Sequence, residues 1–238
     1  MSEQRKLPRH VAVIMDGNGR WAKAHALQVA QGHRRGTETL RAVIRESSDI
    51  GIEALTLYAF STENWRRSAA EVSALMGLLL EYFTSEIDEL DEKNVCIRIL
   101  GDKDGLPALQ REALIRAEER TGRNTGLKLN IAINYGARDE ILRAVRTLAG
   151  RAQRGELKAE EITAADFENA LYTCGLPDVD LLIRTSGEMR LSNFLLYQCA
   201  YAEMVFPTVL WPDFSLQDYH RALDAYAARD RRFGGRTE

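Results

Sequence analysis

The feature that most constrains the fold of this 238-residue chain is a repeated alternation of short apolar runs with longer segments of helical periodicity. The runs are rich in β-branched residues and apolar almost throughout, which is typical of strands covered on both faces in a parallel sheet. They predict strands at 11–15, 54–60, 95–100, 127–133, 181–184 and 209–211. The segments between them predict helices at 37–48, 69–93, 107–121, 138–154, 164–172 and 216–231.

Alternating strands and helices indicate successive βαβ units. We therefore expect an α/β fold, a single-domain three-layer sandwich whose central, mostly parallel six-stranded sheet is flanked by helices. No proline-rich linker, internal repeat or low-complexity tract interrupts the pattern. Residues 1–238 are accordingly predicted to form one domain, with flexible ends at 1–7 and 236–238.

Composition excludes several classes of protein. The 32 basic and 35 acidic side chains give a net charge of −3, which argues against sequence-blind nucleic-acid binding. The three scattered cysteines form no CxxC pair, which is typical of a reducing compartment and not of a disulfide framework or a zinc site. The longest apolar stretch, 74–80, is far shorter than the ~20 residues of a spanning helix, and residues 1–10 hold no apolar signal segment. We expect a cytoplasmic protein without a transmembrane segment.

The predicted helix 69–93 carries more apolar surface than a single buried face requires. An amphipathic stripe recurs at helical spacing, formed by Val72, Leu75, Met76, Leu79, Phe83, Ile87 and Leu90. Leu78, Leu80 and Tyr82 fall beside that stripe and widen it. Two interpretations follow: the helix packs on two sides, or one side lines a cavity for a hydrophobic ligand.

Polar residues follow the first predicted strand, at the end of the sheet where open α/β folds bind ligands. Asp16 ends this strand, and Gly17-Asn18-Gly19-Arg20 then turns into a helix. The glycines allow backbone N–H groups to converge on an anion, Arg20 offers a fork for phosphate oxygens, and Asp16 is placed to hold Mg²⁺. Taken alone, Gly-Asn-Gly also fits an ordinary turn.

Two more clusters admit both a functional and an ordinary interpretation. His33 and Arg34 open the predicted helix 37–48, where positive charge opposes the helix dipole unless an anion lies among the side chains. Residues 61–67 follow the second predicted strand and combine polar groups with the indole of Trp65, which is typical of a binding loop. A solvated charge cluster and a helix cap are the respective alternatives.

A last cluster follows the predicted strand 181–184. Arg184, Arg190 and Ser192 would form a second anion-binding cup, with Glu188 or Glu203 balancing the charge or binding a metal. A surface salt-bridge network is the alternative. The chain lacks a Walker A loop, an Asp-Asp metal motif, HExxH and GxSxG, which excludes several hydrolases and zinc enzymes. Two anion cups, one carboxylate and an apolar helix together indicate an enzyme that joins two amphiphilic diphosphates.

The ordered motifs of the chain resemble the cis-prenyltransferase family, in particular bacterial undecaprenyl diphosphate synthases. The resemblance runs from about residue 8 to residue 235. It rests on the segments HVAVIMDGNGRWA, GHRRG, LTLYAFSTENW, LNIAINYG, IRTSGEMRLSNF, VLWPDF and RRFGG. The departures are Val29 where the family has an arginine, Tyr197 for a tryptophan and Ser68 for a proline.

The resemblance implies the site and its ligands. Asp16 is expected to be catalytic and to bind Mg²⁺, with Glu203 as a second metal ligand and Asn64 as a further catalytic residue. The residues expected to bind the allylic diphosphate are Gly17, Asn18, Gly19, Arg20, His33 and Arg34, and Trp21 and Trp65 are expected to flank its chain. Ser61 and Arg67, together with Asn64, are expected to line the reacting centre, and Thr62 and Glu63 are further expected substrate-binding residues. Those expected to hold isopentenyl diphosphate are Arg184, Arg190, Leu191 and Ser192.

The resemblance also implies an activity. The family extends farnesyl diphosphate with isopentenyl diphosphate through new Z double bonds, here toward undecaprenyl diphosphate, the lipid carrier precursor for cell-wall synthesis. A prenyl tunnel between the sheet and helix 69–93, a homodimer completed by Arg232-Phe233-Gly234, and peripheral contact with a membrane are further expectations. A non-catalytic regulatory subunit of a heteromeric prenyltransferase and an unrelated Mg²⁺-dependent phosphoryl-transfer enzyme are the alternatives. Retention of Asp16 and the arginines speaks against the former, and the lack of a nucleotide fingerprint speaks against the latter.

Overall fold

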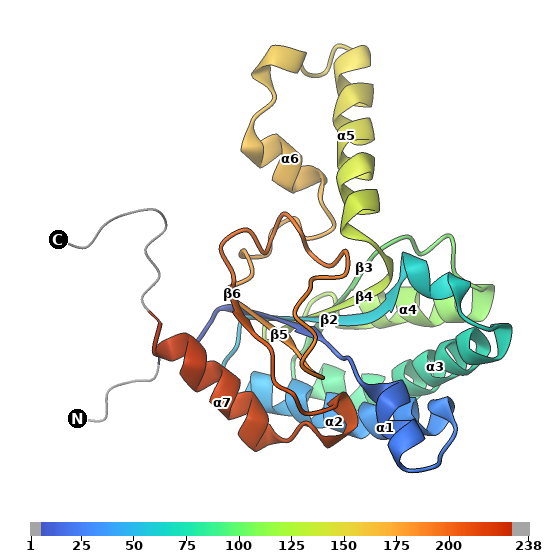
Figure 1. The fold of residues 1–238 in the computed structure, drawn as a ribbon. Coiled ribbons are helices and arrows are strands. Elements are labelled where there is room, and N and C mark those ends of the chain that lie inside the picture. Colours follow the sequence, from blue (N-terminus) through green and yellow to red (C-terminus); the bar gives the residue numbers. More distant parts are fainter. Residues whose placement is uncertain (1–5, 230–238) are drawn as a thin grey trace.

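A computed structural model describes residues 6–229, and at its centre lies a six-stranded sheet (Figure 1). The strand order is β3-β4-β2-β1-β5-β6, and every neighbouring pair is parallel. The strands are β1 (His10–Ile14), β2 (Ala54–Ser61), β3 (Cys96–Leu100), β4 (Lys128–Tyr135), β5 (Leu181–Arg184) and β6 (Glu203–Val205). The predicted α/β sandwich is confirmed, and its sheet is parallel throughout.

One predicted strand, 209–211, is wrong. This segment crosses the carboxyl ends of β1 and β5: the Trp211 N–H donates to Asp16 O at 3.0 Å, and the Ser186 N–H donates to Val209 O at 2.7 Å. The sixth strand is instead β6, which has three partly exposed residues beside β5. So short an edge strand leaves little trace in the hydrophobic pattern.

The helices lie close to the predicted segments, with one exception. They are α1 (Asn18–Ala24), α2 (Val29–Asp49), α3 (Ala69–Glu92), α4 (Ala108–Thr121), α5 (Ala137–Gln153), α6 (Ala164–Ala170) and α7 (Leu216–Ala227). Three short 3₁₀ helices accompany them, η1 (Thr62–Arg66), η2 (Ala159–Glu161) and η3 (Trp211–Asp213). The predicted end of the last helix at residue 231, the segment 232–234, residues 1–5 and the end 236–238 lie outside the described residues.

The exception is α2, which begins eight residues before the predicted start at residue 37. Gly32 and Gly36 lower the helix propensity of this stretch, but both are needed for close packing. A Cβ atom at Gly32 would lie 2.2 Å from Asn18 O, and one at Gly36 would lie 2.4 Å from Asn18 Oδ1. The helix therefore continues across the glycines so that α1 and η3 fit against it, and His33 and Arg34 lie inside α2 instead of at its start.

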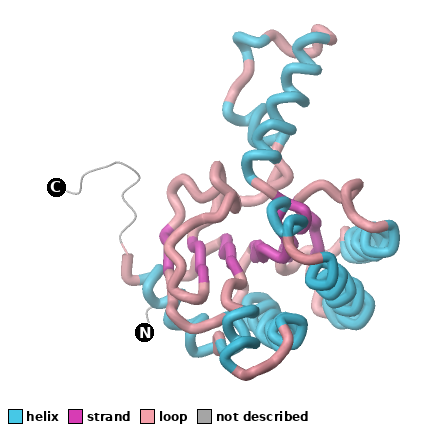
Figure 2. The backbone as a smooth tube through the Cα atoms, turned by 45° about the vertical axis from the view of Figure 1, so that its right-hand side comes forward, coloured by secondary structure: helices cyan, strands magenta, loops and turns pink. Residues whose placement is uncertain are grey.

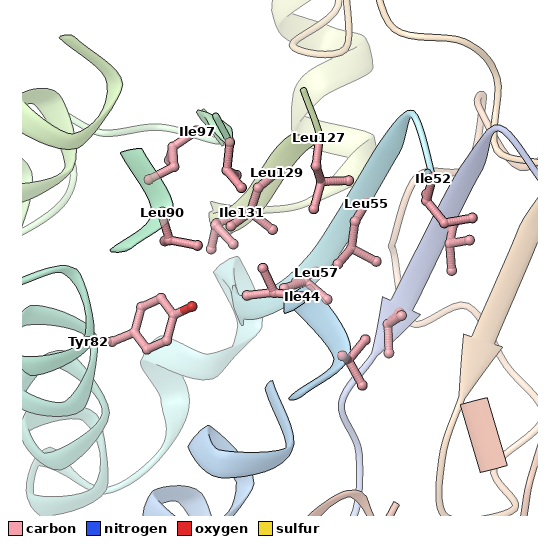
Figure 3. Packing of buried hydrophobic residues seen from close by; sticks show 14 of the residues in the cluster. Ile44, Ile52, Leu55, Leu57, Tyr82, Leu90, Ile97, Leu127, Leu129 and Ile131 are labelled. Carbon is pink, nitrogen blue, oxygen red and sulfur yellow. The ribbon is translucent and has the colours of Figure 1, made fainter. Parts of the chain in front are cut away.

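The two faces of the sheet are covered differently (Figure 2). Alternate strand side chains such as Val13, Leu57 and Ile131 face a layer formed by α2, α3, α4 and α7, where Figure 3 shows Tyr82 pointing from α3 toward the strands. The other strand side chains face Tyr135, Phe194 and the irregular segment 185–202, while α5 and α6 project away from the sheet (Figure 1). The three-layer arrangement is thus helical on one face and largely irregular on the other.

Among residues 6–229, no helix is both long enough and apolar enough to cross a bilayer.

Candidate active site

The site lies where the chain connections diverge on either side of β1. The connection after β1 leads to β2 on one side, whereas the connection after β4 leads to β5 on the other side of β1. In parallel α/β sheets, ligands bind outside the carboxyl ends of the strands at such a switch point. Ile14 pairs with Arg184 in the sheet register, so the sequence-distant Asp16 and Arg184 emerge together at this edge.

Asp16 and Arg184 form the centre of the site. The Arg184 guanidinium donates to Asp16 Oδ2 at 2.8 Å, to Ser192 Oγ at 2.7 Å and to Arg190 O at 2.5 Å. Its side chain is only 5% exposed, whereas that of Asp16 is 29% exposed. Burial alone would raise the pKa of Asp16, but the hydrogen bond and charge of Arg184 outweigh burial and lower the pKa. Asp16 is therefore ionised at neutral pH.

Two further arginines share one carboxylate beside this centre. Arg20 lies 3.2 Å from Glu188 and donates to Ser186 Oγ at 2.5 Å. Arg190 also forms an ion pair with Glu188. The side chains of Arg20 and Arg190 are 49% and 58% exposed, so an incoming anion has access to both. The predicted first and second anion cups consequently lie side by side.

His33 reaches the site from the interior of α2. Its Nε2 atom lies 4.0 Å from Glu71 Oε1, and Arg67 donates to the same carboxylate oxygen at 2.7 Å. Burial, together with the charge of Arg67, lowers the pKa of His33 to about 4. The imidazole is thus neutral at pH 7 and becomes easier to protonate when an anion binds next to it.

Ser61 and Asn64 line the cavity and also cap η1. Asn64 Oδ1 accepts a hydrogen bond from the Ser61 N–H at 3.0 Å. The capping role proposed as the ordinary alternative is therefore present together with the position at the site. The cap lies at the end of β2, and Ser61 and Asn64 line the same cavity as Asp16.

A cavity of about 740 Å³ joins these polar groups to an apolar interior. Its polar lining follows the strand ends, and its apolar lining comes from the inner faces of β2 and β4 and from α2 and α3. The apolar residues include Leu40, Leu57, Leu75, Met76, Leu78, Leu79, Tyr82, Phe83 and Ile131. The helix α3 also packs against α4, so its wide apolar surface both packs against neighbouring elements and lines a cavity.

Several predicted residues do not line this cavity. The Trp21 indole donates to Asp213 at 2.9 Å and stacks on His25. Trp65 faces a separate groove between α3 and α4 and donates to Asn134 at 2.7 Å. Arg34 forms an exposed ion pair with Glu81 on α3.

Of the remaining predicted residues, some lie beside the cavity, as Arg20 does, and others line it. Gly17 has a φ of 109° and precedes α1, and a Cβ atom there would lie 2.9 Å from Leu210. Gly19 lies within α1, where a Cβ atom would make ordinary contact with Val29. Thr62 bonds to Asp139, and Leu191 packs against the second apolar face of the sheet. Asn18 and Glu63 line the cavity.

Glu203 is not brought together with Asp16 in this chain. It pairs with Leu181 in the register of β5 and β6, at the opposite end of the strand from Arg184. Its carboxylate forms an ion pair with Arg229. Among residues 6–229, no group of three His, Cys, Asp or Glu side chains is arranged to hold a metal.

Arg138 and Asn193 are among the cavity residues that were missing from the predicted site. Asn193 Oδ1 accepts from the Arg138 N–H at 2.9 Å, and Asn193 Nδ2 donates to Glu63 at 2.9 Å. Asn193 lies in the segment IRTSGEMRLSNF, whereas Arg138 comes two residues after the segment LNIAINYG, at the end of β4, where no polar cluster was predicted. The parallel sheet places the end of β4 beside that of β2, and this is the signal that was available.

Comparisons with known proteins agree with this arrangement. The sequence matches the family described as putative undecaprenyl diphosphate synthase over residues 14–234. An isoprenyl transferase of Rhizobium meliloti (strain 1021) is 52% identical over 232 residues, covering 98% of this chain and 94% of the relative. An isoprenyl transferase of Geobacillus kaustophilus (strain HTA426) is 51% identical over 229 residues, covering 96% and 89%.

Solved structures agree as well. A lavandulyl diphosphate synthase from Lavandula x intermedia, in complex with dimethylallyl diphosphate, matches with a TM-score of 0.94 at 38% identity and covers 96% of this chain and 98% of the other. A probable undecaprenyl diphosphate synthase from Campylobacter jejuni matches with a TM-score of 0.78 at 34% identity, covering 97% and 100%. Fold and site thus define the class: the chain is a prenyltransferase. It belongs to the undecaprenyl diphosphate synthase family of cis-prenyltransferases.

Proposed function

We propose that this protein condenses isopentenyl diphosphate onto farnesyl diphosphate with Mg²⁺ and extends it with Z double bonds to a long-chain product, undecaprenyl diphosphate. This lipid would serve as the carrier precursor for cell-wall synthesis. The observation that carries the proposal is the continuity of the site: Asp16 after β1 and Arg184 and Arg190 at the end of β5 line the same cavity as the apolar side chains of α3. Such a site suits a substrate with an anionic head and a growing apolar tail.

The arginines divide between two diphosphates. Arg20 and the backbone at 17–19 would bind the allylic diphosphate, helped by His33. Arg184, Arg190 and Ser192, which are joined by hydrogen bonds, would hold isopentenyl diphosphate. Breaking the allylic C–O bond places negative charge on the departing diphosphate, and preorganised guanidinium groups stabilise that charge.

Asp16 fits the proposed Mg²⁺ site. It is ionised, it lines the cavity, and its Oδ1 atom lies 3.8 Å from Arg20 while Oδ2 accepts from Arg184. Mg²⁺ is typically held by one or two carboxylates together with substrate phosphates, so a single aspartate is sufficient. When bound, the ion would neutralise charge on the allylic diphosphate. Glu203 would contribute only if a second subunit or a rearrangement brought it to the site.

A proton must leave the carbocation formed by condensation. Asn64 carries a neutral amide that is already engaged with the Ser61 N–H, so it would orient substrate instead of accepting this proton. The lowered pKa of Asp16 makes its carboxylate a weak base. The departing diphosphate, the other candidate acceptor, is therefore better supported than Asp16.

We also propose a homodimer that rests peripherally on the cytoplasmic membrane surface. Leu142 and Val145, which lie close together on α5, are 51% and 49% exposed, which supports burial of this helix against a partner. The expected contribution of Arg232-Phe233-Gly234 to the partner's site lies outside the described residues. The alternative role of a non-catalytic regulatory subunit is less well supported, because a subunit without catalytic activity would have no need of the ion pair between Asp16 and Arg184.

The test is an assay of purified protein with Mg²⁺, farnesyl diphosphate and labelled isopentenyl diphosphate, with chromatography of the products. We expect long Z-prenyl diphosphates and loss of turnover with EDTA that Mg²⁺ restores. Absence of turnover would contradict the proposed prenyl transfer. A product of a single condensation would support prenyl transfer but contradict the proposed elongation to a long-chain product. Gel filtration would test the dimer separately.

A further inference from the structure

Arg138 differs from the other cations of the cavity lining. Arg184, Arg190 and Arg67 each form an ion pair with a carboxylate, and His33 lies 4.0 Å from one. Within the described part of the chain, the Arg138 guanidinium makes no hydrogen bond or ion pair; only its backbone N–H is bonded. Arg138 is nevertheless an exposed residue of the cavity lining.

Backbone contacts hold Arg138 beside the second anion cup. Asn193 accepts hydrogen bonds from two consecutive residues of α5, through Oδ1 from the Arg138 N–H at 2.9 Å and through its backbone O from the Ala137 N–H at 2.8 Å. Asn193 follows Ser192, whose hydroxyl accepts from Arg184. A short chain of directional contacts therefore fixes the first turn of α5 to the loop that carries Arg184's partners.

Among residues 6–229, no carboxylate forms an ion pair with Arg138, and the two nearest in sequence and contact have other partners. Asp139 accepts a hydrogen bond from Thr62 at 3.2 Å, and Glu63 accepts one from Asn193 at 2.9 Å. An anion that binds Arg184 or Arg190 competes with a carboxylate of the protein, whereas an anion that binds Arg138 does not. An exposed guanidinium of this kind attracts anions over a distance of about 10 Å at moderate salt and offers a bidentate contact.

We propose that Arg138 binds the diphosphate of isopentenyl diphosphate during its entry and thereby determines the KM for this substrate. The inference rests on the proposed function and adds a binding residue to it. The allylic diphosphate is the less suitable ligand, because Arg138 is tied to the loop of Ser192 and Asn193 and not to residues 17–20.

The test compares Arg138→Gln with Arg146→Gln. Arg146 is an exposed residue of the same helix, does not line the cavity, and its replacement removes the same charge. For Arg138→Gln we expect the KM for isopentenyl diphosphate to rise about 10-fold, with kcat and the KM for farnesyl diphosphate nearly unchanged. Arg138→Lys should recover part of the loss, and kcat/KM should fall less steeply with salt in Arg138→Gln than in the unmodified protein.

Three results would overturn the assignment. They are an unchanged KM for isopentenyl diphosphate, an equal rise in Arg146→Gln, and a rise for farnesyl diphosphate alone. Calorimetric titration with inorganic pyrophosphate separates this inference from the proposed function. If the unmodified protein binds pyrophosphate but forms no prenyl product, the proposed function fails, and weaker pyrophosphate binding by Arg138→Gln alone still supports an anion-binding Arg138.

Discussion

The cavity has two parts, a polar mouth formed by Asp16, Arg184 and their neighbours at the strand ends and an apolar interior lined by β2, β4, α2 and α3. Different physical interactions hold these two parts together. At the mouth, the Arg184 guanidinium has three acceptors at fixed distances, and Asp16 is held by that contact. In the interior, Leu57, Leu79 and Ile131 present only apolar surface. Directional bonds decide geometry at the mouth, whereas the interior depends on the amount of apolar area and the available volume.

This difference suits a substrate whose head stays in place while its tail lengthens. Each five-carbon unit buried in the interior contributes up to about 4 kcal/mol, without requiring a particular orientation. The head requires particular hydrogen-bond partners, because an unpaired buried charge is costly. Substitutions at the mouth should therefore change rates and KM, whereas those in the interior should change product length.

The largest effect is expected for Asp16→Ala. Loss of the carboxylate removes the proposed Mg²⁺ ligand and leaves the 5% exposed Arg184 side chain without its charged partner. We expect kcat to fall about 1,000-fold, measured as incorporation of labelled isopentenyl diphosphate. The control is Asp49→Ala, which removes an exposed aspartate at the end of α2. Similar turnover in both variants would show that the mouth does not depend on this carboxylate.

His33 should make the stability of the protein decrease at acid pH. Burial lowers the pKa of His33 from its ordinary value of 6.5 to about 4, so the folded state binds fewer protons than the unfolded state between these values. Stability present above pH 6.5 should be lost as the pH falls toward 4, by up to about 3 kcal/mol. Denaturant unfolding of His33→Gln should show a shallower decline than that of the unmodified protein over this range.

Part of the loss of stability at acid pH should remain in His33→Gln. Burial also lowers the pKa of His10, which bonds to Thr56 and Pro177 at the opposite end of the strands. If His33→Gln retained the full acid sensitivity, the low pKa of His33 would be refuted. Diphosphate should raise the pKa of His33, so binding near pH 5.5 should be accompanied by proton uptake in calorimetry.

Arg184→Lys tests how strongly the mouth depends on geometry. A lysine keeps the charge but lacks the planar fork that reaches Asp16, Ser192 and the Arg190 carbonyl together. We expect the KM for isopentenyl diphosphate to rise about 30-fold. Arg221→Lys, an exposed replacement on α7, should have no effect. An unchanged KM for isopentenyl diphosphate in Arg184→Lys would show that positive charge is sufficient at this position and that the planar geometry of the guanidinium is not needed.

The smallest change in rate, but a change in product, is expected for Leu79→Phe. The larger side chain takes space from the tail, so products should become shorter by about one five-carbon unit while the first addition proceeds normally. Leu80→Phe is the matched control, since Leu80 lies on α3 but not in the cavity lining. Chromatography that shows identical products for both variants would place the growing tail elsewhere.

The sequence predicted the residues at the cavity mouth better than the direction of several side chains around it. Asp16 and Arg184 both follow buried apolar runs, and parallel strands bring such positions to one edge. The indoles of Trp21 and Trp65 were expected along the prenyl chain, but their N–H groups bond to Asp213 and Asn134 outside the cavity lining. Side-chain direction depends on partners far away in sequence, which a motif does not contain.

Local pattern therefore determined the strand ends, the order of α and β elements and the family of the chain. Tertiary structure alone decided that α2 continues through Gly32 and Gly36. Glycine destabilises a helix, and here the close packing of α1 and Trp211 against these two positions offsets that loss of stability. It also decided that Glu203 lies at the far end of the sheet from Asp16, and that Arg138 joins the mouth. The physical reason is that periodicity records the burial of each residue, whereas register and close packing arise between segments that the sequence keeps far apart.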